Sequence, residues 1–91
     1  MVLRIKLYGD LREKIPNIRS KSGTPITLNI KSDKIERVED ILGRLNIKEG
    51  EVSHIFINNK YSGIGDRVKN GDRIGIFPKR MGIIFVEIKN D

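Results

Sequence analysis

Apolar and polar side chains alternate along residues 2–8, and a period of two is typical of a β-strand with one buried face. Leu3, Ile5 and Leu7 occupy the side that we expect to face a core. A glycine and an aspartate end this strand, and the residues after them allow one helical turn before a proline. Residues 26–30 alternate in the same way, so they predict a second strand, which we expect to run antiparallel to the first.

The hydrophobic period then changes to that of a helix. A stripe of apolar residues predicts a helix of about three turns over residues 35–45. We expect Asp33 to cap its N-terminus, with Glu36 completing a capping box, and Asn46 to end it in the left-handed conformation. The stripe consists of Ile35, Val38, Ile41, Leu42 and Leu45.

Two more strand-like segments, residues 52–57 and 73–77, lie in the second half of the chain. The first runs into Asn58 and Asn59, which tolerate positive φ and favour a tight turn. Residues 61–68 are expected to form a connector, and a turn that contains a glycine precedes the second segment, which a proline closes.

This order of elements predicts an α+β domain in which one helix covers one face of a mixed sheet of four to five strands. Because a crossover between parallel strands is right-handed, we expect the first strand beside the last one, in the middle of the sheet. The arrangement is the β-grasp, or ubiquitin-like, fold. We assign residues 1–82 to this domain and interpret residues 83–91 as an extra C-terminal strand of the same domain.

The chain has 91 residues and a formal net charge of +6, which indicates a polyanion or an acidic protein surface as a partner. The basic residues are scattered, however, and no cluster is longer than the pair Lys79 and Arg80. We therefore interpret most of the charge as a solvated surface. We also expect no aromatic side chains on the solvent side on which bases could stack, so nucleic acid is a disfavoured partner.

Composition also limits the compartment and the chemistry. No apolar run approaches the ~20 residues of a membrane span, and the alternating start predicts a strand and not a signal peptide. The chain has no cysteine, which excludes disulfides, a thiolate metal site and a persulfide on the chain itself. We therefore expect a cytoplasmic protein without a membrane partner.

Few residues are candidates for catalysis. His54 lies in a predicted strand without a second histidine for a shared metal site. Gly63 and Gly65 lack the third glycine and the strand–helix context of a dinucleotide-binding loop, so we interpret them as turn residues. Asp72 is expected to bind the backbone amides of its turn. With no nucleophile–base pair and no phosphate-cradling loop, we predict a protein that is not an enzyme and has no metal or cofactor.

Four segments follow one another in an order that is typical of one protein family. Residues 7–13 (LYGDLRE) resemble that family's first strand and turn, and residues 38–45 are similar to its helix. Residues 55–60 (IFINNK) resemble a strand and turn, with Asn59 where glycine is usual, and residues 68–78 (VKNGDRIGIFP) match the end of the pattern. The family is that of the ubiquitin-like sulfur carriers, which includes the small subunit of molybdopterin synthase and the carrier of thiamine biosynthesis.

The resemblance implies a function for the C-terminus. In the family, an adenylating, E1-like partner activates a terminal Gly-Gly carboxylate, which becomes a thiocarboxylate and donates sulfur to a pterin or thiazole precursor; a larger synthase subunit is a second partner. The carrier is then at most a co-substrate of the partner enzyme. The tail residues that this implies are Lys79, Arg80, Met81 and Gly82. The chain departs from the family because Ile83 stands where the second glycine is expected, and the chain continues.

The continuation resembles a strand, with Ile84, Val86 and Ile88 on one face. Since a bare apolar strand is prone to aggregation, we expect it to pair with its own sheet, with a second copy in a homodimer, or with a partner chain. The residues that we expect to bind a partner are therefore Phe77, Pro78, Ile84, Val86 and Ile88. Removal of the extension by a protease after Gly82 is the alternative.

We thus predict a small ubiquitin-like protein that is related to these carriers and presents its sheet face and C-terminal segment to a partner protein. One alternative is a non-catalytic β-grasp module that binds a partner or self-associates without sulfur transfer. A less favoured alternative, motivated by the positive charge, is a β-grasp domain that faces RNA.

Overall fold

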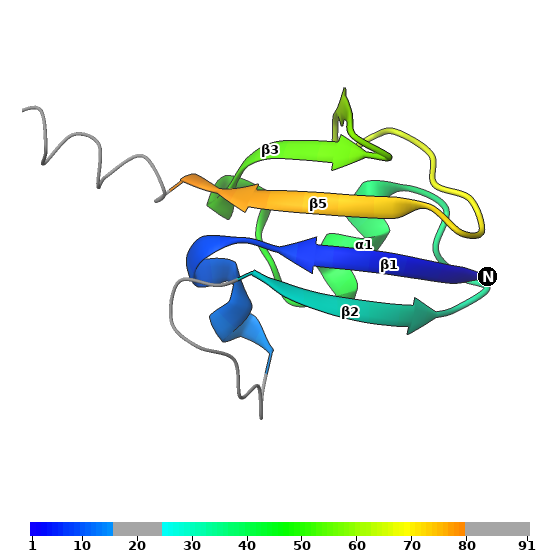
Figure 1. The fold of residues 1–91 in the computed structure, drawn as a ribbon, viewed down its shortest axis with the longest axis horizontal. Coiled ribbons are helices and arrows are strands. Elements are labelled where there is room, and N and C mark those ends of the chain that lie inside the picture. The colour runs from blue at the N-terminus through cyan, green and yellow to red at the C-terminus, as the bar shows by residue number, and fades with distance from the viewer. Residues whose placement is uncertain (16–24, 80–91) are drawn as a thin grey trace, which may run out of the picture.

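The computed structural model describes residues 1–15 and 25–79 of the chain. This part of the chain folds into five strands, one α-helix and two 3₁₀ helices (Figure 1). The elements in chain order are β1 (Val2–Leu7), η1 (Gly9–Lys14), β2 (Ile26–Lys31), α1 (Val38–Arg44), η2 (Glu49–Glu51), β3 (Val52–Ile57), β4 (Lys60–Ser62) and β5 (Arg73–Pro78). Every predicted element within the described residues is present, and β4 is an additional strand inside the predicted connector.

The five strands form one mixed sheet in the order β2-β1-β5-β3-β4. The first strand, β1, pairs antiparallel with β2 and parallel with β5, so that Ile5 lies opposite both Leu28 and Ile74. On the other side of β5, β3 is antiparallel to both β5 and β4. Helix α1 crosses behind the strands in Figure 1, so it covers one face of the sheet and leaves the other open. The predicted β-grasp fold is confirmed.

The hydrophobic core fills the space between the sheet and α1. Ile5 on β1, Ile41 on α1 and Ile76 on β5 are completely buried. Each fully buried side chain of this size stabilises the fold by about 1.5–3 kcal/mol relative to an exposed one. The other large side chains that are fully buried are Leu3, Leu7, Leu11, Val38 and Ile74.

The helix begins later than predicted, because the backbone before it pairs with a distant loop. The carbonyl of Glu36 accepts a hydrogen bond from the N–H of Val68 (3.0 Å), and the N–H of Val38 donates to the carbonyl of Asp66 (3.1 Å). These bonds hold Arg37 extended, at φ −131° and ψ 165°, so the helix starts only at Val38. The predicted cap formed by Asp33 and Glu36 is therefore wrong.

Asp40, in the first turn of α1, provides the contacts that we had assigned to that cap. Its Oδ2 accepts hydrogen bonds from the backbone N–H groups of Glu36 (3.0 Å) and Arg37 (2.9 Å). These two bonds, with the nearby charge of Arg37, lower the pKa of Asp40 below its ordinary value. A carboxylate at this end of a helix also interacts favourably with the helix dipole.

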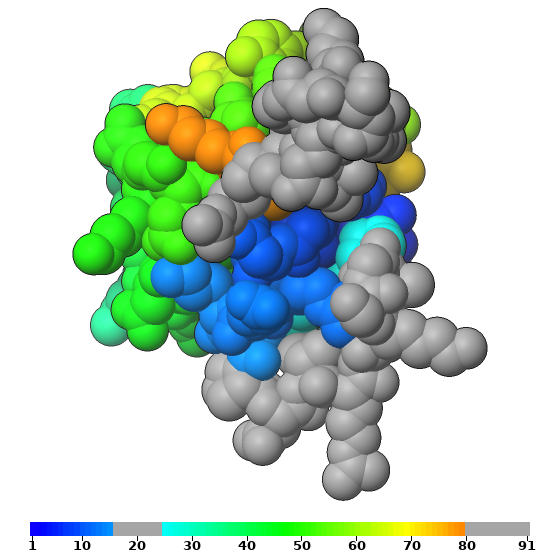
Figure 2. Space-filling model, turned by 90° about the vertical axis from the view of Figure 1, so that its left-hand side faces the viewer, coloured from blue at the N-terminus to red at the C-terminus, as the bar shows by residue number. Residues whose placement is uncertain are grey.

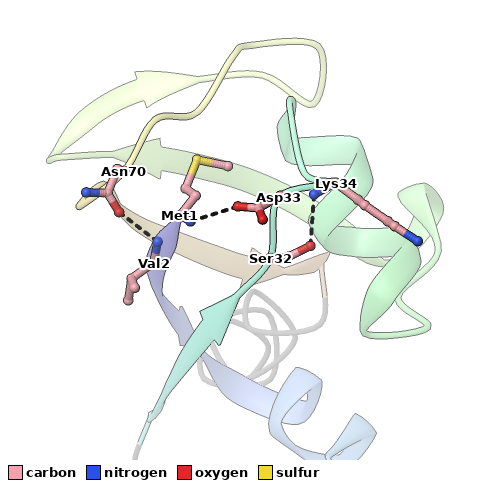
Figure 3. Close-up of polar contacts among 6 residues, drawn as sticks. All are labelled: Met1, Val2, Ser32, Asp33, Lys34 and Asn70. Atoms are coloured by element: carbon pink, nitrogen blue, oxygen red, sulfur yellow. Dashed lines mark hydrogen bonds and ion pairs between the residues drawn. The ribbon is translucent and has the colours of Figure 1, made fainter.

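Asp33 instead contacts the start of the chain (Figure 3). Its Oδ1 lies 3.2 Å from the terminal ammonium group of Met1, and its side chain is 97% exposed. Asn70 Oδ1 accepts a hydrogen bond from the N–H of Val2 at 2.7 Å, and Ser32 Oγ accepts one from the N–H of Lys34 at 3.0 Å. The contacts of Met1 and Val2 fasten the start of β1 to the loops that precede α1 and β5, and the bond from Lys34 to Ser32 lies within the first of these loops.

Three asparagines adopt positive φ angles, as the sequence predicts. Asn46 follows α1 with a φ of 57°, and Asn58 and Asn59 form the turn between β3 and β4 with φ angles of 51° and 68°. Positive φ at both central residues is the geometry of a type I′ turn, whose twist matches that of a two-residue hairpin. This turn is what allows β4 to pair back onto β3, with Ile57 opposite Lys60.

Asp72 is buried beneath the same hairpin, at 4% exposure. Its Oδ2 accepts the N–H of Lys69 (2.8 Å), and its Oδ1 accepts the side-chain amide of Asn58 (2.9 Å). Asn58 Oδ1 in turn accepts the N–H of Arg73 at 3.0 Å. The predicted structural role of Asp72 in its turn is confirmed, and the network also ties the β3–β4 hairpin to the start of β5.

Candidate functional site

The face of the sheet opposite α1, which we call the open face, carries a distinctive set of side chains. Alternate strand residues point toward it because their neighbours point into the core. None of the five strands contains an aspartate or a glutamate. The residues of the open face are Val2, Arg4, Lys6, Tyr8, Thr27, Asn29, Lys31, His54, Phe56, Tyr61, Arg73, Gly75 and Phe77.

A row of aromatic rings crosses the open face from β1 to β4. Tyr8 and Phe77 are stacked, with ring centroids 3.9 Å apart and an interplanar angle of 9°. Phe77 meets the edge of Phe56 at 5.6 Å, and Phe56 lies 5.7 Å from Tyr61. His54 lies 5.9 Å from Tyr61 on the same side. Each aromatic pair adds about 0.5–1.5 kcal/mol beyond the area that it buries, so the row is a preformed surface.

The absence of solvent-side aromatics that we expected from the sequence is therefore wrong. Tyr61 is 67% exposed, and Tyr8, Phe56 and Phe77 are partly buried. The signal was present in the alternation: Phe56 lies between two core-facing isoleucines of β3, and Phe77 follows the buried Ile76 of β5. The spacing of these residues along the sequence does not show that their rings are neighbours, because they lie on different strands.

Positive charge lies beside the aromatic row. Arg4 on β1 is paired directly with Arg73 on β5, and Lys6 lies one pleat further along β1, opposite Gly75. Lys6 Nζ is 5.4 Å from the centroid of the Tyr8 ring, within the range of a cation–π contact. The expected scatter of the basic residues holds along the sequence, but the sheet gathers these three.

A hollow of about 380 Å³ lies between the charges and the rings. Gly75 helps to form it, since a glycine adds no side chain between Lys6 and Phe56 on the neighbouring strands. A Cβ built on Gly75 would lie 3.6 Å from a ring carbon of Tyr8, an ordinary van der Waals contact. The residues that line the hollow are Arg4, Lys6, Tyr8, Thr27, Phe56, Asn59, Arg73, Ile74 and Gly75.

The C-terminal residues that we predicted as a site are only partly described. Phe77 belongs to the aromatic row, and Pro78 is buried, with its carbonyl accepting a hydrogen bond from Ser53 Oγ at 3.1 Å. Lys79 is exposed and borders a hollow of about 290 Å³ with Asp10, Gly50 and Glu51. The others, Arg80, Met81, Gly82, Ile84, Val86 and Ile88, lie outside the described residues.

Glu51 is held at this end of the molecule by two contacts. Its carboxylate accepts a hydrogen bond from the N–H of Lys48 (2.9 Å) and forms an ion pair with Lys14 (2.9 Å). The backbone hydrogen bond and the contact with Lys14 lower the pKa of Glu51 below its ordinary value. The ion pair links η1 to η2 beneath the end of β5.

The minor candidates occupy structural positions. His54 Nδ1 lies 2.9 Å from Ser53 Oγ. The N–H of Gly63 donates to Asp66 Oδ2 at 2.7 Å, and the carbonyl of Gly65 accepts from the Arg37 guanidinium at 2.8 Å, so both glycines shape a turn. Within residues 1–15 and 25–79, no group of three histidine, aspartate or glutamate side chains is placed to hold a metal ion. No helix in the same ranges combines the length and apolarity that a membrane crossing requires.

Comparisons with known proteins bear on the fold. A scan of protein-family models finds no match, and no curated protein matches in sequence. Among solved structures, small archaeal modifier protein 1 of Haloferax volcanii matches with a TM-score of 0.59 and 19% identity, over 85% of this chain and 95% of that one. A putative molybdopterin converting factor subunit 1 of Pyrococcus furiosus matches with a TM-score of 0.59 and 21% identity, over 86% and 97%.

A third similar structure is a complex of subunits 1 and 2 of the molybdopterin-converting factor of Helicobacter pylori, with a TM-score of 0.52 and 19% identity over 86% of this chain and 93% of the matched one. At these identities the likeness is one of fold. The five-stranded sheet, the single α-helix that covers it and these matches agree, and they show that this chain has the β-grasp fold of the ubiquitin-like carriers and modifiers.

Proposed function

We propose that this chain is a ubiquitin-like protein related in function to the sulfur carriers, and that it presents its open face and C-terminal segment to a partner protein. It supplies no catalytic group in this role and acts as a co-substrate of an adenylating enzyme or as the small subunit beside a larger one. The subunit pair named for the Helicobacter pylori structure provides a precedent for the second arrangement.

The observation that carries the proposal is the place where the chain leaves the sheet. Phe77 stacks on Tyr8 at the end of β5, one residue before the buried Pro78 and two before the exposed Lys79. Figure 2 shows this end of the molecule, where the end of β5 (orange) and η1 (blue) reach the same surface. A partner that docks on the aromatic pair therefore holds the start of the C-terminal segment beside it.

Aromatic anchors of this kind suit a protein interface. Tyr8 and Phe77 are partly buried and fix each other's orientation, so little side-chain entropy is lost when a partner covers them. A glycine in the following segment lacks a Cβ, which suits a tail that enters a narrow channel. Gly82 is the candidate for that position in this chain.

The test is the intact mass of the protein after co-expression with an adenylating enzyme of the carrier pathway and a persulfide sulfur donor. In the proposed reaction the partner uses ATP to form an acyl-adenylate at the carboxylate of Gly82 and releases pyrophosphate. The terminal sulfur of the persulfide then displaces AMP and forms an acyl disulfide. A second thiol of the partner cleaves this acyl disulfide, which releases the thiocarboxylate and leaves a disulfide on the partner. The expected product ends at Gly82 and carries one sulfur atom in place of one oxygen.

Two chains make this experiment decisive. A version that ends at Gly82 bypasses any need for cleavage, and the same version with Gly82→Val is its control, since a branched side chain thickens the tail. Conversion of the first and not of the second supports the carrier. If the version ending at Gly82 stays unmodified while an authentic carrier is converted in the same cells, the sulfur-carrier function is wrong.

The second candidate function is a non-catalytic binding or self-associating module, and Ile83 is the observation that favours it. Its test is deletion of residues 83–91. A module that uses the extension as a strand should lose thermal stability or change its oligomeric state on size-exclusion chromatography with light scattering. A carrier whose extension is removed in the cell should keep both properties.

A further inference from the structure

Arg4 and Arg73 form a pair of like charges that the fold itself does not neutralise. They occupy directly opposed positions on β1 and β5, at the spacing of neighbouring strands. Two positive side chains that start from paired positions of neighbouring strands repel each other. Within the described part of the chain, neither Arg4 nor Arg73 forms an ion pair with a carboxylate. The position therefore favours an external anion.

The surface around this pair is shaped to admit such an anion. The hollow of about 380 Å³ lies on one side of the two arginines and adds Lys6 as a third cation. A second hollow of about 310 Å³ shares both arginines and is lined further by Val2, Asn29, Asn70 and Gly71. The two hollows follow each other past one charged pair, so the surface suits an extended anion better than a compact one.

Flat rings lie next to the same charges. Phe56 lines the larger hollow together with the three cations, and Tyr61 lies 5.7 Å from Phe56 at 67% exposure. A ligand that alternates anionic groups with planar apolar groups matches this pattern. Single-stranded nucleic acid has this composition, because its phosphates bind basic side chains while its unpaired bases stack on aromatic rings.

We propose that the open face is a binding site for single-stranded nucleic acid, in which Arg4, Lys6 and Arg73 hold backbone phosphates and the rings of Phe56 and Tyr61 stack on bases. The proposal goes beyond the carrier function and needs neither an adenylating partner nor the tail after Lys79. A duplex would use only the cations, since its bases are stacked on each other inside the helix. An acidic peptide such as oligoglutamate would engage the cations but has no planar group to stack on the exposed ring of Tyr61.

The experiment measures fluorescence anisotropy of a labelled oligouridylate of about ten nucleotides, a length within the ~4–16 that comparable surfaces cover. The full chain is titrated between ~50 and ~200 mM salt. Three phosphate contacts predict that the logarithm of the affinity falls with the logarithm of the salt concentration with a slope of about −2, at roughly −0.7 per contact. Free uridine monophosphate, a duplex of the same length and an oligoglutamate peptide are measured in parallel.

Two variants and their controls identify the contacts. In Arg4→Gln/Arg73→Gln the salt slope should fall to about −0.7, because one phosphate contact remains. Its control, Lys34→Gln/Arg44→Gln, removes the same charge from exposed positions off the open face and should keep the wild-type slope. Tyr61→Leu removes an exposed ring and should weaken binding roughly 5- to 150-fold with the slope unchanged.

Three results would overturn the proposal. One is an equal loss of affinity in the two charge variants, which would make the binding a general effect of net charge. Another is that the duplex or uridine monophosphate binds as tightly as the single strand. The third is tighter binding of the acidic peptide than of the oligonucleotide at the same salt, which would assign the open face to an acidic protein.

Discussion

Removal of the buried carboxylate of Asp72 should destabilise the protein more than removal of any exposed one. Asp72 is 4% exposed and accepts hydrogen bonds from the N–H of Lys69 at 2.8 Å and from Asn58 Nδ2 at 2.9 Å. In Asp72→Ala both donors lose their acceptor. The β3–β4 hairpin also loses one of its ties to the start of β5, whereas the bond between Asn58 Oδ1 and the N–H of Arg73 remains.

The magnitude follows from these contacts. A hydrogen bond to a charged group contributes about 1.5–3 kcal/mol, and a donor left unsatisfied in a partly buried place costs about 1–3 kcal/mol. Asn58 and Lys69 are both exposed residues and both hydrogen bonds are partly buried, so water compensates part of the cost at each donor. We therefore expect a loss of roughly 3 kcal/mol in the free energy of unfolding, which corresponds to a Tm lower by roughly 10–25 °C for a domain of this size.

The assay is urea denaturation followed by far-ultraviolet circular dichroism. Asp33→Ala is the matched control, because it removes the same side chain from a place that is 97% exposed, where an ion pair contributes about 0–1 kcal/mol. If Asp72→Ala costs no more than Asp33→Ala, the interpretation of Asp72 as the fastening point of the hairpin is wrong. Asn58→Ala should cost an intermediate amount and should be strongly non-additive with Asp72→Ala.

Three further predictions concern the open face and the helix start. Gly75→Ala should raise the free energy of unfolding by about 0.5–1 kcal/mol in the same urea assay, because glycine weakens a strand and an added Cβ makes only ordinary contacts there. A destabilised variant would contradict the geometry of the hollow. Phe77→Ala should lower the free energy of unfolding by no more than about 3–5 kcal/mol, and Phe77→Leu should lower it by less. If the stacked pair of Phe77 and Tyr8 anchors the partner, both variants should lose binding to the partner enzyme in a pull-down. The wild type should have a higher free energy of unfolding than Asp40→Asn, and this difference should be complete above pH 3.8, the ordinary pKa of the carboxyl. It should vanish as the pH falls through the lowered pKa of the folded state. Chemical denaturation across this pH range measures the difference, and a difference that grows on acidification would contradict the prediction.

The fold could be predicted from the sequence because its signals are local. The alternation of Leu3, Ile5 and Leu7 fixes which face of β1 is buried, and the residues at positive φ, Asn46 and Asn58, mark where elements end. The right-handed crossover rule then placed β1 beside β5. These inferences need only neighbouring residues and one general rule of topology.

The features that were missed depend on contacts between distant parts of the chain. The helix starts late because Glu36 and Val38 bond to Val68 and Asp66, and no pattern near residue 36 records that pairing. The strand β4 has only three residues, too few for a visible alternation. For the candidate site, Phe77 was predicted, but its stacking on Tyr8 arises only when β1 and β5 lie side by side.

The placement of β5 between β1 and β3 has a consequence for the order of folding. The β3–β4 hairpin forms across a two-residue turn, and β1 pairs with the next strand along the chain, β2, but these two pairs join into one sheet only through β5. The sheet can therefore close only after residues 73–78 have been synthesised, and its closing step, the pairing of Ile5 with Ile74, spans most of the described chain. Such non-local pairing is slow compared with hairpin formation, so insertion of β5 is expected to limit the folding rate.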